Sequence, residues 1–157
     1  MGTHERWIVT NPDLKIKEDA KLFSPAIRSA YEHPSYLKLF EEYCLKGFSI
    51  RYSGCFAVDC YQMFIKGHGV YSLLDSIAHP SRLSLIYEII PVAFLIEKAG
   101  GKTSDLYKSV LDVPIAGYEQ RISFIGGSAN DVEHIIKTVN EEKEAAQWVK
   151  FLIYHIY

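Results

Sequence analysis

Hydrophobic residues return at helical spacing in long stretches of the chain. Over residues 34–46 and 130–143 they lie three or four positions apart, which is the pattern of a helix with one buried face. A third stretch, residues 83–99, is mostly apolar and ends at Gly100-Gly101, a typical helix stop. Pro91 lies inside it, so we expect a kink or a break in the first turn there. The two periodic faces consist of Tyr36, Leu39, Phe40 and Tyr43, and of Val132, Ile135, Ile136 and Val139.

Short stretches rich in β-branched or aromatic residues alternate with these helices. One more helix is expected to start at Ser53-Gly54 and to run to about Lys66, before Gly67. Intermixed strands and helices without an internal repeat predict an α/β fold, a mixed β-sheet layered with helices. The predicted strands are residues 21–23, 48–52, 70–74 and 122–125, with weaker candidates at 102–104 and 110–111.

Length and composition predict one ordinary globular domain. The chain has 157 residues, of which 48% are hydrophobic and 13% aromatic, so it can bury a sizeable core. We expect residues 1–20 to form a polar lead-in segment, residues 21–143 to form the domain, and residues 144–157 to form an apolar tail. The tail could be a last helix or strand packed on the core, or an exposed end that needs a partner.

Bulk features argue against several classes of protein. No run of 18 or more apolar residues is present, so we expect no membrane span. The net charge is −2 with mixed signs, so no basic field indicates nucleic acid as a partner. The first residues lack the apolar core of a signal peptide. Three cysteines suit free thiols in a reducing compartment, although spacing alone permits a Cys55–Cys60 disulfide. We expect a cytoplasmic location, with a plastid or another organelle as the alternative.

The stretch Arg51-Tyr52-Ser53-Gly54 has the composition of an anion site. A turn that leads from a strand into a helix exposes backbone N–H groups and the positive end of the helix dipole. The planar guanidinium of Arg51 is suited to phosphate. The alternative is a surface arginine beside a core tyrosine.

Glu88 is a second candidate, because it lies among apolar neighbours in the stretch that follows Arg82. Burial of an unpaired carboxylate is costly, so Glu88 needs a cation, a proton or hydrogen-bond donors. Mg²⁺, which prefers oxygen ligands, is one solution. A carboxylate on a helix face that reaches water, or pairs with lysine or arginine, is the other.

Several short motifs follow one another along the chain. They are Lys21-Leu-Phe-Ser-Pro25, Ser35-Tyr-Leu-Lys-Leu39, Arg51-Tyr-Ser-Gly54, Asp59, Leu85-Ile-Tyr-Glu-Ile-Ile-Pro91, Leu95-Ile-Glu-Lys-Ala-Gly-Gly101, Ser104-Asp105, Lys108-Ser-Val-Leu-Asp112, Arg121 and Gly127-Ser128. Their order resembles the C-terminal half of the fructose-1,6-bisphosphatase family, and within it the sedoheptulose-1,7-bisphosphatase branch most. The resemblance implies that this chain supplies the C-terminal, sugar-phosphate-binding part of an α-β-α-β-α sandwich. The implied reaction is hydrolysis of the 1-phosphate of a ketose bisphosphate with Mg²⁺.

The resemblance implies roles for four residues. Glu88 corresponds to the metal-binding glutamate of a Tyr-Glu-x-x-Pro motif. Arg51 and Tyr52 match the pair that holds the distal phosphate, and in the family this arginine reaches into a neighbouring subunit, which implies a homo-oligomer. Arg82 stands where the family has a substrate-binding lysine. No residue of this chain receives a catalytic role.

The chain also departs from the family pattern. Ile27 replaces an asparagine that touches substrate, Leu73 replaces a phosphate-binding tyrosine, and Leu106 stands where the family has glycine. The Asp-Pro-x-Asp-Gly-Ser motif that supplies the other metal carboxylates is missing from the sequence. We therefore expect little or no phosphatase activity from this chain alone. The alternative is a non-catalytic sugar-phosphate-binding or interaction protein derived from the half-domain.

Overall fold

A mixed sheet of five strands, in the order β2-β1-β3-β5-β4, lies at the centre of the fold. The computed structural model describes residues 9 and 11–156, without the side chains of residues 30, 31 and 143–156. The strands are β1 (Leu22–Pro25), β2 (Ser49–Ile50), β3 (Val70–Leu73), β4 (Lys102–Ser104) and β5 (Phe124–Gly127). The helices are α1 (Pro34–Leu45), α2 (Phe56–Lys66), α3 (Ile90–Lys98) and α4 (Ala129–Ile156), with short 3₁₀ helices η1 (Ile27–Glu32) and η3 (Val110–Asp112) and the π-helix η2 (Leu85–Ile89).

Strand direction divides the sheet into two parts. β1 pairs in parallel with both β2 and β3, whereas β5 runs antiparallel to β3 and to β4. Phe23 is paired with Ile50 on one side and with Val70 on the other. Since parallel strands end at the same edge, the segments that follow β1, β2 and β3 emerge together.

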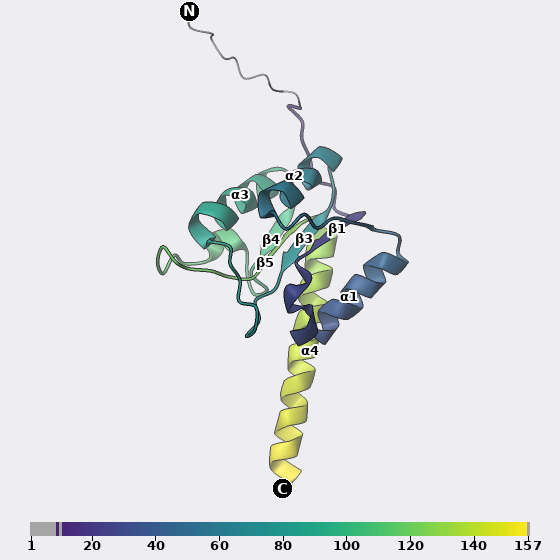
Figure 1. The fold of residues 1–157 in the computed structure, drawn as a ribbon, viewed down its shortest axis with the longest axis vertical. Coiled ribbons are helices and arrows are strands. Elements are labelled where there is room, and N and C mark those ends of the chain that lie inside the picture. Colours follow the sequence, from purple (N-terminus) through teal and green to yellow (C-terminus); the bar gives the residue numbers. More distant parts are fainter. Residues whose placement is uncertain (1–8, 10, 157) are drawn as a thin grey trace, which may run out of the picture.

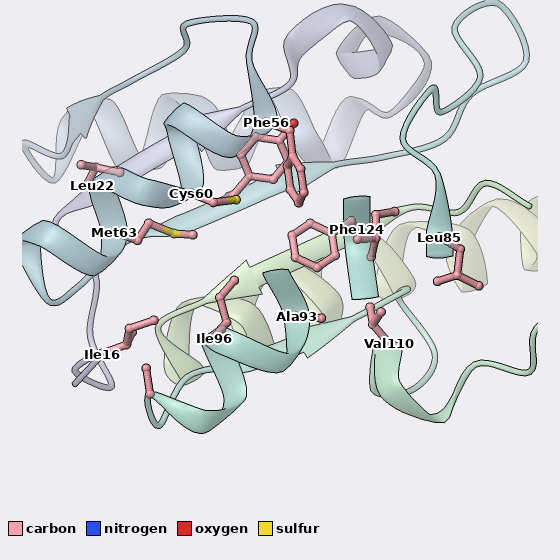
Figure 2. Packing of buried hydrophobic residues seen from close by; sticks show 13 residues of the cluster. Ile16, Leu22, Phe56, Cys60, Met63, Leu85, Ala93, Ile96, Val110 and Phe124 are labelled. Carbon is pink, nitrogen blue, oxygen red and sulfur yellow. The ribbon is translucent and has the colours of Figure 1, made fainter. Parts of the chain in front are cut away.

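Two hydrophobic clusters cover the two faces of the sheet, because neighbouring residues of a strand point to opposite faces. Tyr71 and Phe124 belong to the cluster under α2 and α3, in which the Phe56 ring lies 5.1 Å from Tyr71 and 5.3 Å from Phe124 between centroids. Their neighbours Val70 and Ile125 belong to the cluster under α1 and α4. Figure 1 shows the helices as two layers, and Figure 2 shows side chains of α2, α3 and the sheet pointing into the first cluster. The predicted α/β class is confirmed.

The predicted helix over residues 83–99 is divided in two. Its first part is η2, in which the N–H of Ile90 donates to the carbonyl of Leu85, five residues earlier. α3 follows, with Pro91 in its first turn. Proline fits there because its missing N–H is not needed in a first turn, so the predicted break is observed.

Other boundaries differ from the sequence prediction for identifiable reasons. The strand expected at residues 110–111 is wrong: η3 occupies this position, and the Ser109 hydroxyl accepts the N–H of Leu111 as an N-cap. The strand expected at 48–52 keeps only Ser49–Ile50 in the ladder, and the helix expected from Ser53 begins at Phe56. The last strand is shifted to Phe124–Gly127, because Gly126 and Gly127 pair with strands on both sides.

Both ends of the chain continue beyond the sheet. Ile16 is buried, and its N–H donates to the carbonyl of Ala99 over 2.8 Å, while the N–H of Ala20 donates to Asp131 over 2.6 Å. At the other end, α4 extends as one helix to Ile156 and projects past the body of the domain (Figure 1). The tail backbone is thus helical up to Ile156, and contacts of its side chains lie outside the described residues. No helix in the described part is long and apolar enough to cross a membrane.

Gly127 is the position at which the sheet tolerates a side chain least. Its φ is +141°, and an added Cβ would lie 2.1 Å from the carbonyl oxygen of Gly69. We therefore expect Gly127→Ala to lower the free energy of unfolding by about 3 kcal/mol or more, as measured by urea denaturation.

The matched control is Gly117→Ala, where nothing lies within 4 Å of the added Cβ. This variant should stay within about 1 kcal/mol of the parent chain. Equal stability of the two variants would contradict the close approach of β5 to β3.

Candidate functional site

A pocket of about 290 Å³ opens at the edge where the parallel strands end. Ala26 follows β1, Tyr52 follows β2 and Leu73 ends β3, and all three line the pocket. Its size is at the lower end of small-molecule sites, which span about 300–1,000 Å³. The other lining residues are Arg28, Ser29, Gly54, Phe56, Tyr71, Ala78, His79, Pro80, Arg82 and Leu83.

The pocket lining contains positively charged side chains and no negatively charged ones in the described part of the chain. Arg28 and Arg82 line it, and no aspartate or glutamate is among its lining residues in the described part of the chain. No described residue forms an ion pair or a hydrogen bond with either guanidinium. Such a pocket favours an anion, because two unpaired guanidinium groups are available to a phosphate or carboxylate.

The turn after β2 is held by a buried acid. Asp59 is fully buried on α2, and its Oδ1 and Oδ2 accept the N–H of Ser53 over 3.0 and 3.2 Å. Gly54 takes a φ of +79°, which lets the chain turn into the helix. Phe56, at the start of α2, lines the pocket, so the N-terminal, positive end of this helix lies beside it. The predicted strand-to-helix turn is therefore present.

The structure separates the predicted pair Arg51 and Tyr52. Tyr52 lines the pocket and is 45% exposed. Arg51 does not line it: this side chain is exposed, and its Nη1 donates to the carbonyl of Ile50 over 2.9 Å. Adjacent residues of an extended segment point in opposite directions, so only one of the pair can face the pocket of its own chain.

Arg82 lies at the end of the loop 75–82, which forms one wall of the pocket. The Arg121 guanidinium donates to the carbonyl of Arg82, and a bridge between Ser84 and Arg121 continues this contact. At the tip of the loop, the carboxylate of Glu32 accepts the N–H groups of Ile77 and Ala78, each over 3.0 Å. These bonds tie the loop to η1 and to Arg121, which precedes β5.

Glu88 lies outside the pocket and is partly buried on η2. Its Oε2 accepts the N–H of Ser84 over 2.7 Å, so the carboxylate caps the start of its own helix. Among the described residues, no group of three histidine, cysteine or acidic side chains could hold a metal ion. Mg²⁺ takes a near-octahedral set of oxygens. One carboxylate does not supply it, so the residues described do not fit Mg²⁺ by themselves.

Arg28, Ser29 and His79 are polar pocket residues to which the sequence analysis gave no role. Arg28 and Ser29 follow a predicted strand directly, and the convergence of parallel strand ends is the signal that could have found them. His79 lies in a loop whose path depends on Glu32, which no local pattern reveals.

Tyr71, also in the lining, is buried, and burial raises the pKa of its phenol well above the usual range. This phenol is therefore neutral at physiological pH.

Two of the three family departures have clear structural consequences. Leu73 lines the pocket, so an apolar side chain stands where a hydroxyl could contact phosphate. Leu106 has a φ of +91° and is 5% exposed. Burial of its side chain offsets the strain of this left-handed conformation. Ile27 is 48% exposed on η1 and does not line the pocket.

The cysteines take no part in this site. Cys44, Cys55 and Cys60 are all free, so the disulfide that spacing permits between Cys55 and Cys60 is absent. Burial raises the pKa of the Cys60 thiol, which keeps it unreactive.

Comparison with known proteins places the chain in a family. Residues 16–140 match the model of the fructose-1-6-bisphosphatase C-terminal domain. The chloroplastic sedoheptulose-1,7-bisphosphatase of Triticum aestivum is 34% identical over 146 residues, covering 88% of this chain and 37% of the relative. The chloroplastic enzyme of that name from Chlamydomonas reinhardtii is 34% identical over 141 residues, covering 83% and 36%.

A solved structure supports the same assignment. The crystal structure assigned by name as a sedoheptulose-1,7 bisphosphatase from Toxoplasma gondii superposes with a TM-score of 0.78 at 38% identity, covering 80% of this chain and 41% of that one. The chain spans under two fifths of the length of the curated relatives it matches. On these matches, the chain belongs to the fructose-1,6-bisphosphatase family and corresponds to its C-terminal domain.

Proposed function

We propose that the chain is the sugar-phosphate-binding part of a sugar bisphosphatase, which hydrolyses the 1-phosphate of a ketose bisphosphate in carbohydrate metabolism. One observation carries the proposal: Arg82 and Tyr52, two positions at which the resemblance implies substrate binding, line one pocket that no acidic side chain lines in the described part. A guanidinium and a phenol supply the donors that a phosphate dianion needs.

In this proposal Tyr52 and Arg82 hold the phosphate distal to the reacting group. Arginine replaces the family's lysine at position 82, which keeps the charge and adds a fork that can hold two phosphate oxygens. Arg51 is exposed and does not line the pocket of its own chain, which supports a role in the pocket of a neighbouring copy. The proposal therefore includes a homo-oligomer.

The relatives' names support a sedoheptulose bisphosphate over a fructose bisphosphate as substrate. Leu73 agrees with this preference, because the resemblance places a phosphate-binding tyrosine there in fructose bisphosphatases. The curated relatives are described by their names as chloroplastic, which supports the plastid alternative for this chain.

Glu88 enters the proposal as one ligand of a magnesium site that needs further carboxylates. Its Oε2 is bonded to Ser84, and Oε1 has no hydrogen-bond partner among the described residues. The residues described do not form a complete site, so hydrolysis is proposed for the whole bisphosphatase and not for this chain alone.

A non-catalytic sugar-phosphate-binding or interaction protein is the second candidate function. It is supported by the lack of a metal-binding group within the described chain and by Leu73 in the pocket. Both functions need the pocket to bind a sugar phosphate, but only the first needs completion of the metal site.

The proposed pocket predicts binding of fructose 6-phosphate by the 157-residue chain, measured by isothermal titration calorimetry. Arg82→Ala should raise the Kd about tenfold, because a charge-assisted hydrogen bond contributes on the order of 1.5–3 kcal/mol.

Lys66→Ala is the matched control, since Lys66 ends α2 at the far end from the pocket and is exposed. It removes the same charge and should leave the Kd unchanged. Equal losses in both variants would indicate a nonspecific charge effect and count against the pocket.

We also expect no phosphate release from sedoheptulose 1,7-bisphosphate by this chain in millimolar MgCl₂. One carboxylate cannot organise Mg²⁺ for hydrolysis. The measurement is a colorimetric assay of inorganic phosphate against a no-enzyme blank. Release that disappears in Glu88→Gln would show that the chain forms a complete metal site by itself and would overturn the expectation.

A further inference from the structure

The short connection between α2 and β3 is bonded to the segment that leads into β1. The N–H of Lys17 donates to the carbonyl of Gly67 over 2.9 Å, and the N–H of Lys21 donates to Nδ1 of His68 over 3.2 Å. Lys21 immediately precedes β1, the strand that is paired in parallel on both sides. The connection therefore holds the chain at the point where it enters this strand, at the end of the sheet opposite the pocket.

The backbone on both sides of His68 is held by further hydrogen bonds. Gly69 exchanges two of them with Ser128: its N–H donates to Oγ over 3.1 Å, and its carbonyl accepts the N–H of Ser128 over 2.8 Å. On the other side, the carbonyl of Gly67 is bonded to Lys17. The partly buried imidazole is thus positioned beside Lys21 by a backbone that is fixed independently of the side chain.

The bond from Lys21 requires a neutral imidazole. A neutral histidine has one ring nitrogen that accepts a hydrogen bond, whereas a protonated histidine has two donors and no acceptor. The group that faces Nδ1 is a backbone N–H, which can only donate. The geometry therefore places the proton of the neutral ring on Nε2, and a second proton on Nδ1 is incompatible with the bond.

The charges around His68 have one sign. Lys17 and Lys21 come from the segment before β1, and Lys66 comes from the last turn of α2. Burial of the ring and the proximity of these three ammonium groups lower the pKa of His68. In the described part of the chain, none of the three lysines forms an ion pair.

The acids of the neighbouring elements do not neutralise this cluster. Asp19 accepts a hydrogen bond from Nδ2 of Asn130 over 2.8 Å, and Asp131 on α4 accepts the N–H of Ala20 over 2.6 Å. Glu18 is exposed and forms no ion pair within the described part of the chain. A proton taken up by His68 therefore adds a fourth positive charge without a paired carboxylate.

We propose that His68 is a pH-sensitive switch that attaches the segment before β1 to the connection between α2 and β3. In the closed state, neutral His68 accepts the N–H of Lys21. Uptake of one proton from solvent at Nδ1 turns the acceptor into a donor, breaks this bond and brings a fourth cation beside the three lysines. The segment is therefore released at its junction with β1 as the pH falls. This inference does not depend on the proposed function.

The direction of the pKa change sets the pH range of the switch. In the unfolded chain, His68 titrates near its ordinary value of about 6.5. Because the folded chain holds this proton less readily, the unfolded state binds more protons once the pH falls below that value. The contribution of His68 to stability is thus complete above about pH 7.5 and declines as the pH falls through 6.5.

The first test follows the 157-residue chain by NMR between pH 8 and pH 5. The Cε1–H resonance of His68 should titrate with a midpoint below 6.5, and the amide proton of Lys21 should move upfield with the same midpoint. The amide of Lys17 is the internal control, since its acceptor is a carbonyl that does not titrate in this range. A Lys21 amide that does not follow His68 would overturn the inference.

The second test compares urea unfolding at pH 7.5 and pH 5. His68→Asn keeps an acceptor oxygen near the position of Nδ1 and cannot titrate, so its unfolding midpoint should fall less on acidification than that of the parent chain. His33→Gln is the matched control, because Nε2 of His33 is bonded to the carbonyl of Asp75 over 2.9 Å and that bond survives protonation. This control should lose as much as the parent.

A double variant tests the contribution of the lysines. Lys17→Ala combined with Lys66→Ala should raise the NMR midpoint of His68 toward 6.5, because two of the three ammonium groups beside the ring are removed. An unchanged midpoint in this variant would contradict the proposed cluster of charges. Equal acid losses in the parent chain and in His68→Asn would likewise overturn the switch.

Discussion

The position of β1 between two parallel partners is the constraint on which the site depends. All four residues of β1 are buried, and the strand is paired on both sides. Because β2, β1 and β3 run in the same direction, the segments after them leave the sheet at one edge. These segments carry Tyr52, Arg28 and Arg82, which lie far apart in the sequence. A change of direction in any one of these strands would remove its residue from the pocket.

Two carboxylates, the buried Asp59 and the partly exposed Glu32, hold the segments in place after they leave the sheet. Asp59 accepts the N–H of Ser53 and fixes the turn after β2, and Glu32 accepts two N–H groups of the loop after β3. Both acids bind backbone N–H groups, and neither lines the pocket. The two carboxylates therefore stabilise the backbone around the pocket, while the arginines that line it keep their charge available to a ligand.

The proposed magnesium site has one candidate ligand, Glu88, in the described part of the chain. Glu88 is partly buried and caps its own π-helix through Ser84. Two of its apolar neighbours in the sequence, Leu85 and Ile89, are fully buried. The hydrogen bond to the backbone is the way this carboxylate meets the cost of partial burial. The second oxygen has no hydrogen-bond partner among the described residues, and it is the atom that the proposed magnesium site would use.

Local patterns in the sequence determined much of the fold. The periodic faces around Tyr36 and Val132 became α1 and α4, and the strand residues 70–73 were recognisable from their side chains alone. The motif order, in which Glu88 and Tyr52 occur at family spacing, was sufficient to identify the family. Such features depend on residues only a few positions apart, so they can be read from the sequence without knowledge of the fold.

Only the tertiary structure decided which of these residues share a site. Tyr52 lines the pocket and Arg51 does not, although the two are adjacent in the sequence. Arg28 and Ser29 joined the site because β1 is the central parallel strand, a fact that depends on pairing with residues more than 20 positions away. Long-range pairing and the bonds of Glu32 set these positions, and no local periodicity contains that information.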